Sequence, residues 1–109
     1  MSLRGLSECT HFIVNSSTSP IVVAAAVVTQ RVYIYRLIIV VGGATVVTLQ
    51  DTGANVVSGP LSLLVGGSIV LDVPNNNESW WNTNTGFGLQ IAFTNGVTVG
   101  GDIWIIQGP

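Results

Sequence analysis

The sequence contains no lysine, and its only basic side chains are Arg4, Arg31 and Arg36. Charged residues make up 7% of the chain, whereas an ordinary soluble domain has about a quarter. The formal net charge is −2. So few cations exclude the capture of nucleic acid through counterion release. We therefore expect no nucleic-acid partner.

Long apolar runs are also lacking, although 48% of the residues are hydrophobic. The runs at 21–28 and 37–41 end at polar or glycine residues, and a membrane-spanning helix needs about 20 apolar residues. The opening MSLRGLSECTHF has no apolar stretch of signal-peptide length. These absences predict that the protein is made in a cytoplasm and does not enter a membrane.

One cysteine and one histidine restrict the chemistry that the chain can perform. Cys9 excludes an internal disulfide and fits a reducing compartment. Cys9 and His11 share one side of an extended segment, but the sequence offers no obvious third group to orient them. No further Cys or His completes a four-ligand zinc site, and no acid spacing fits a calcium loop. We expect no catalytic residues, no metal and no cofactor.

The shortage of charge leaves two interpretations for a domain of 109 residues. It could be an uncharged monomer that Asn, Thr, Ser and Gln keep soluble, or its apolar faces could be covered by identical subunits or by another protein surface. We favour the second interpretation.

What the chain has in abundance is Val and Ile, with Thr beside them, and these β-branched residues favour strands. Gly or Pro recurs about every ten residues and would interrupt any helix. The pattern predicts an all-β, antiparallel, jelly-roll-like sandwich of about eight strands, in one domain at 12–109. Residues 1–11 fit either a disordered tail or an arm along a neighbour. The strands are expected at 12–15, 21–29, 32–41, 45–50, 55–58, 68–73, 87–93 and 102–107.

The expected strand at 32–41 is apolar on both faces, so we predict that it is central or covered by a neighbour. One face carries Val32, Ile34, Ile38 and Val40. The other carries Tyr33, Tyr35, Leu37, Ile39 and Val41. Arg36 interrupts the first face, and we expect it to pair with a carboxylate or to reach the rim.

Turns are expected at 51–53 and 94–96, where Asp, Asn and Gly tolerate positive φ, and residues 74–79 are expected to form an exposed loop. Trp80 and Trp81 are adjacent, so in a strand one indole enters the core while the other lies on the surface. Both could instead close the bottom of the sandwich, or the outer one could contact a protein or a sugar ring. Trp104, between Ile103 and Ile105, is predicted to be a core residue.

The segments RVYIYRLIIVVGGATVVTLQDTGANVVSGPL, SIVLDV and WWNTNTGFGLQIAFTNGVTVGGDIWII together resemble jelly-roll decoration (cement) proteins of tailed bacteriophages, and the related heads of fibre and spike proteins. The resemblance spans about 21–107. It implies a non-enzymatic virion protein on the capsid exterior, commonly a homotrimer, that clamps the major capsid protein. The alternative is a receptor- or glycan-binding fibre head. The resemblance supplies no functional residues. The interface residues that we nominate are Arg4, Phe12, Tyr33, Tyr35, Asn76, Trp80 and Trp81.

Overall fold

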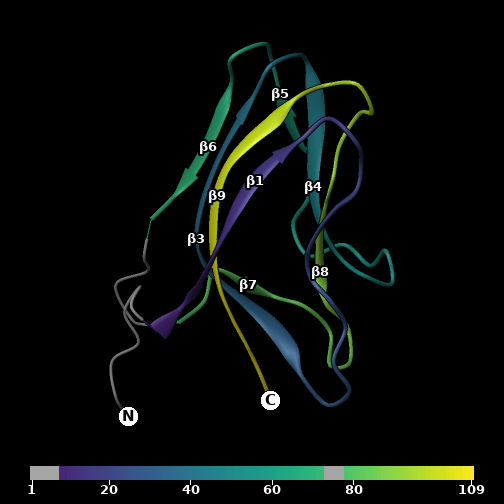
Figure 1. The fold of residues 1–109 in the computed structure, drawn as a ribbon, viewed down its shortest axis with the longest axis vertical. Coiled ribbons are helices and arrows are strands. Elements are labelled where there is room, and N and C mark those ends of the chain that lie inside the picture. The colour runs from purple at the N-terminus through teal and green to yellow at the C-terminus, as the bar shows by residue number, and fades with distance from the viewer. Residues whose placement is uncertain (1–7, 73–77) are drawn as a thin grey trace.

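The computed structural model describes residues 8–72 and 78–109. Within them the chain forms nine strands in two antiparallel sheets that pack face to face (Figure 1). The strands are β1 (Thr10–Ser16), β2 (Ile21–Ala24), β3 (Arg31–Val41), β4 (Thr45–Asp51), β5 (Leu61–Leu63), β6 (Ser68–Leu71), β7 (Trp81–Asn82), β8 (Leu89–Ala92) and β9 (Val99–Gly108).

The strand order is that of a jelly roll. One sheet runs β1-β9-β3-β6, with the short β7 also paired to β3, and the other runs β2-β8-β4-β5. Without β7, eight strands remain, four in each sheet, and the first strand lies beside the last, as in two interlocked Greek keys. The prediction of an antiparallel, jelly-roll-like sandwich is confirmed, with one short strand more than the eight expected.

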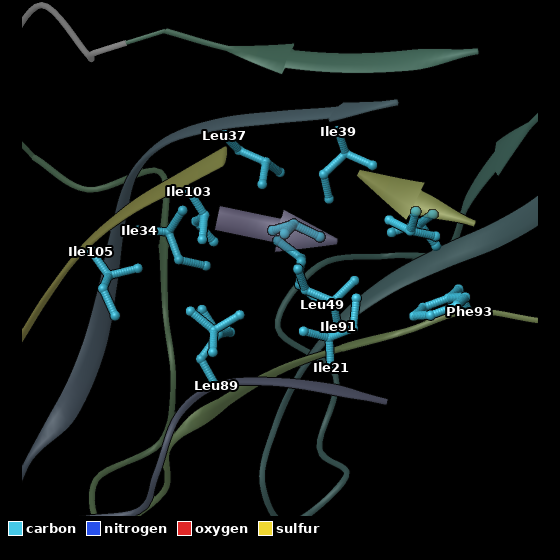
Figure 2. Packing of buried hydrophobic residues seen from close by; sticks show 14 of the residues in the cluster. Ile21, Ile34, Leu37, Ile39, Leu49, Leu89, Ile91, Phe93, Ile103 and Ile105 are labelled. Carbon is cyan, nitrogen blue, oxygen red and sulfur yellow. The ribbon is translucent and has the colours of Figure 1, made fainter. Parts of the chain in front are cut away.

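Branched aliphatic side chains from both sheets fill the space between them (Figure 2). Leu37 and Ile39 of β3 lie on one side of this layer, and Leu49 and Ile91 of β4 and β8 lie on the other; all four are 0% exposed. Burying a side chain of this size contributes about 1.5–3 kcal/mol. This packing holds the two sheets together, so that the side chains on their outer faces stand on a rigid backbone.

A β-bulge in β3 changes which residues share a face. The register against β9 shifts between Ile34 and Arg36, so that Tyr35 is an extra residue and alternation restarts after it. Val32 and Ile34 consequently face the core together with Leu37, whereas the sequence pattern placed them with Ile38. That face assignment is wrong because one inserted residue exchanges the two faces of every later residue. The expectation that this strand is central is confirmed, since β3 lies between β9 and β6.

Two predicted strands have different limits in the structure. The strand expected at 21–29 ends at Ala24, and the chain then turns at 27–30, where Gln30 N donates to Val27 O and Thr29 adopts a φ of 67°. The strand expected at 55–58 contributes only an isolated bridge between Val56 and Gln50. Pairing along β4 resumes after Pro60, in β5, which the sequence analysis missed along with β7.

The N-terminal boundary also moves. β1 begins at Thr10, so residues 10 and 11, which were grouped with a tail or arm, belong to the sheet. Residues 1–7 and most of the loop expected at 74–79 lie outside the described residues. Where the chain is described, it has no helix long and apolar enough to cross a membrane.

Candidate protein-interaction face

The outer face of the five-stranded sheet combines apolar, aromatic and charged side chains in an ordered arrangement. Strand pairing aligns its residues in rows that run across the sheet. The first row is His11, Trp104 and Arg36. The second is Ile13, Asp102, Ile38 and Val70, and the third is Asn15, Gly100, Val40 and Ser68. We call the side chains of these three rows the outer β9 face, because β9 runs through its middle.

Trp104 is held between two partners from the strands on either side of it. The His11 ring stacks on the indole with a centroid distance of 4.6 Å and an interplanar angle of 16°. The guanidinium carbon of Arg36 lies 4.7 Å from the indole centroid. An aromatic pair contributes about 0.5–1.5 kcal/mol beyond its buried area, and a cation over an indole contributes about 0.5–2 kcal/mol. The indole is therefore fixed in position before any partner arrives.

Each cation or imidazole of this stack also meets a carboxylate. His11 Nε2 lies 2.7 Å from Asp102 Oδ1, with the imidazole N–H as donor. Arg36 Nε lies 3.4 Å from Asp72 Oδ1, which is an ion-pair distance, although the direction does not make a hydrogen bond. The prediction that Arg36 pairs with a carboxylate is confirmed. Because Arg36, the cation of this stack, already has an acid beside it, a partner could cover this face without meeting an isolated cation.

Apolar side chains surround the stack. Ile13 is 68% exposed, Val70 is 63% exposed and Val40 is 46% exposed, and they come from three different strands of the sheet. Single exposed aliphatic residues are ordinary, but several on one face beside an ordered tryptophan are typical of a binding surface. The expectation that part of the surface is covered by another protein surface stays a prediction.

Trp104 was predicted to be a core residue, and the structure shows otherwise. Ile103 is 0% exposed and Ile105 is 4% exposed, so both point inward, and the residue between them in an extended strand must point outward. The Ile-Trp-Ile alternation was the signal that could have placed Trp104 correctly. The hydrophobic character of the indole favours a core position, but the alternation with two buried isoleucines places it outside.

The seven nominated interface residues occupy different environments. Phe12 and Trp81 are partly buried against the core, and Tyr35 is 5% exposed. Tyr33 lies on the outer side of β3, where its hydroxyl donates to Pro109 O at 2.7 Å. Trp80 is 44% exposed. Arg4 and Asn76 lie outside the described residues. Of the five members within the described residues, the structure therefore places Tyr33 and Trp80 toward the surface.

The tryptophan pair divides between inside and outside, as expected for adjacent residues near a strand. Trp81 packs against the core, whereas Trp80 is 44% exposed. The Trp80 Nε1–H donates to the carbonyl oxygen of Asp72 at 2.5 Å, and its backbone N–H donates to Ile34 O at 2.8 Å. This division favours the expectation of one inner and one outer indole over the alternative that both close the bottom of the sandwich.

The outer face of the four-stranded sheet has a different character. It exposes Val22 at 52% and Val46 at 45%. Across its two inner strands, Gln90 Nε2 donates to Gln50 Oε1 at 3.0 Å. Asp51 is the one charged residue in β2, β4, β5 and β8, and it is 0% exposed. This face therefore offers uncharged polar and aliphatic groups, and its strands lack the Trp, His and Arg combination of the outer β9 face.

The same contacts bear on the chemistry considered for Cys9 and His11. Asp102 orients His11, so the expectation that no third group orients this histidine is wrong. Asp102 and His11 are far apart in the sequence, but they lie on the paired strands β9 and β1. The imidazole is also stacked on Trp104, which restrains its rotation. Within residues 8–72 and 78–109, no three His, Cys, Asp or Glu side chains form a group that could hold a metal ion.

The fold and this face define an all-β jelly-roll domain with an ordered, mostly neutral outer surface. Comparison with known proteins returned no matching family, no matching curated protein and no matching solved structure.

Proposed function

We propose that this chain is a non-enzymatic virion structural protein that binds the exterior of a capsid through its outer β9 face. The observation that supports this proposal is the preformed stack of His11, Trp104 and Arg36, flanked by exposed Ile13 and Val70. Interface hot spots are enriched in Trp, Tyr and Arg, and they lie in well-packed surroundings that exclude water. The resemblance to phage decoration proteins supplies the kind of assembly.

The charge arrangement favours a protein surface as the partner. Asp102 and Asp72 accompany His11 and Arg36 on the chain itself, so the face has little net charge to attract a strongly charged ligand. Interface cores are depleted in unpaired charge and contain large side chains that are already ordered. The proposed partner is the major capsid protein, and a rigid sandwich that covers a joint between its copies would stabilise the shell.

Two valines with nearly equal exposure on opposite sheets provide a test. Val40, on the outer β9 face, is 46% exposed, and Val46, on the outer face of the four-stranded sheet, is 45% exposed. We predict that Val40→Lys raises the dissociation constant for shells assembled from the major capsid protein of the same virus by roughly tenfold or more, because it inserts an unpaired cation. Val46→Lys should bind as the natural protein does. Co-sedimentation with shells, titrated to saturation, measures both.

Equal binding by the two variants would contradict the placement of the interface on the outer β9 face. Absence of saturable binding by the natural protein would contradict the capsid role itself. Circular dichroism and melting temperature of each variant show whether the fold is intact before either conclusion is drawn.

A second candidate function is glycan or receptor recognition by a fibre head, which the exposure of Trp80 favours. The Trp80 indole is 44% exposed, and its bond to Asp72 O fixes its orientation. Indole faces of this kind can stack on sugar rings, which are apolar on one side. On this alternative, Trp80→Ala abolishes binding on a glycan array while Val40→Lys leaves it unchanged. No glycan binding by the natural protein removes this candidate.

A further inference from the structure

The strands at the edges of the two sheets differ in how well they are protected against pairing with another chain. Exposed edges usually carry prolines, charges, bulges or very short strands that prevent such pairing. β2 has four residues, follows Pro20 and has a register shift against β8. β5 has three residues and follows Pro60, and β6 has four residues and precedes the 80% exposed carboxylate of Asp72.

β1 has none of these protective features. It is the longest edge strand of the described residues, with seven residues, and it pairs with β9 without a register shift from Thr10 to Ser16. It contains no proline and no acid. Its one ionisable group, His11, is bound to Asp102 of the same chain. No described strand pairs with its other side, so alternate backbone N–H and C=O groups of β1 point away from the sheet.

The sequence of β1 is compatible with pairing to itself. Ile13 is the middle residue of β1, so antiparallel pairing along the whole strand puts Ile13 opposite Ile13 of the second copy. The same register puts His11 opposite Asn15, and Phe12 opposite Val14. No like charges meet, the 68% exposed Ile13 gains an apolar neighbour, and the partly buried Phe12 lies opposite the apolar Val14.

We propose that β1 pairs antiparallel with β1 of a second copy across a two-fold axis, which joins the two five-stranded sheets into one continuous sheet. Antiparallel pairing of one strand with its own copy closes on itself, so it stops at two copies. The arrangement gives two copies instead of the three that the resemblance implies. It requires no capsid partner, and it places two outer β9 faces side by side on one surface.

The experiment uses the full chain alone and measures its mass by light scattering and native mass spectrometry over a range of concentrations. The natural protein is expected at twice the chain mass of 11.4 kDa. Ile13→Lys opposes two ammonium groups across the axis and is expected to raise the dimer dissociation constant roughly a hundredfold or more. Val70→Lys is the matched control, because Val70 is 63% exposed on the same sheet but on its other edge, and it should remain a dimer.

Charge exchange gives the sharpest form of this test. Ile13→Glu alone should also be monomeric, whereas an equal mixture of Ile13→Lys and Ile13→Glu should recover a dimer that contains one of each. A natural protein that is monomeric or trimeric at every concentration would overturn the proposal, as would a dimer that survives Ile13→Lys or that Val70→Lys disrupts equally.

Hydrogen exchange provides a measurement that needs no variant. The outward amides of β1 are expected to be protected at high protein concentration and to exchange faster on dilution, while amides of β3 keep the same rate. Protection of β1 that does not depend on concentration would contradict pairing between copies. Because no shell is present in these experiments, their outcome is independent of the capsid role.

Discussion

Gly101→Ala is expected to lower the stability of the domain by about 3 kcal/mol or more, which corresponds to a fall in melting temperature of roughly 12 °C or more. Gly101 has a φ of 142°, a region that side-chain-bearing residues rarely adopt. An added Cβ would lie 1.9 Å from Ile38 O and 2.8 Å from Ile38 C, and both are backbone atoms that cannot move alone. Thermal unfolding followed by circular dichroism measures the effect.

The neighbouring glycine is the control for this substitution. At Gly100 an added Cβ would meet its nearest neighbour, Val14 O, at an ordinary 3.7 Å. Gly100→Ala should therefore change the stability by less than about 1 kcal/mol, because the new methyl group fits the space. Equal melting temperatures for the two variants would show that β9 does not approach β3 as closely as the structure indicates.

Asp51→Ala is expected to cost about 3 kcal/mol, because it removes the group that closes the β4 turn. The Asp51 side chain is 0% exposed. Its carboxylate accepts from Gly53 N at 2.9 Å, from Asn55 N at 3.0 Å and from Asn84 Nδ2 at 3.3 Å. Without it, these donors lose a charged acceptor in partly buried surroundings. Urea unfolding at constant temperature gives the free-energy difference.

Asp72→Ala serves as the matched control for Asp51→Ala. The Asp72 side chain is 80% exposed, and its contact with Arg36 Nε is an ion pair at 3.4 Å. A pair whose acid is this exposed, although Arg36 itself is 29% exposed, contributes about 0–1 kcal/mol. A loss at Asp51 no greater than the loss at Asp72 would mean that the turn does not depend on the buried carboxylate.

The sequence predicted the fold class because the relevant signals are local. β-branched residues favour strands and recurring glycines favour turns, whichever strands they later pair with. The turn expected at 51–53 is present, with Ala54 N donating to Asp51 O at 2.9 Å. The positive φ in this turn falls on Ala54 instead of Gly53. Asp51 holds the turn through local contacts with Gly53 N and Asn55 N, which are typical of an Asp at a turn, and through Asn84, which the local sequence does not reveal.

The candidate face was harder to predict because its members come from distant parts of the chain. His11 and Asp102 are 91 residues apart in sequence, and they meet only when β1 pairs with β9. Arg36 lies beside Trp104 because of the bulge at Tyr35. Neither Tyr35 nor the residues around it in the sequence indicate that a bulge occurs there. Trp104, in contrast, could have been placed from the alternation of Ile103 and Ile105.

The proposed dimer and the proposed capsid role make different demands on the same sheet. Pairing between copies uses β1, at the edge of the sheet. Capsid binding uses the outer β9 face, where the exposed Val40 and Val70 lie on β3 and β6. The two surfaces meet at Ile13, which belongs to both. A dimer would present two copies of the His11, Trp104 and Arg36 stack in one plane, which suits a partner that itself repeats.

Hydroxyl-radical footprinting with mass spectrometry tests the central claim most directly, because it reports which aliphatic side chains a partner covers. The protein is oxidised alone and again after saturating binding to shells. The account predicts that Val40 and Val70 become protected while Val22 and Val46, on the opposite sheet, react as before. Protection of Val22 and Val46 with unchanged reactivity of Val40 and Val70 would show that the protein binds through its other face.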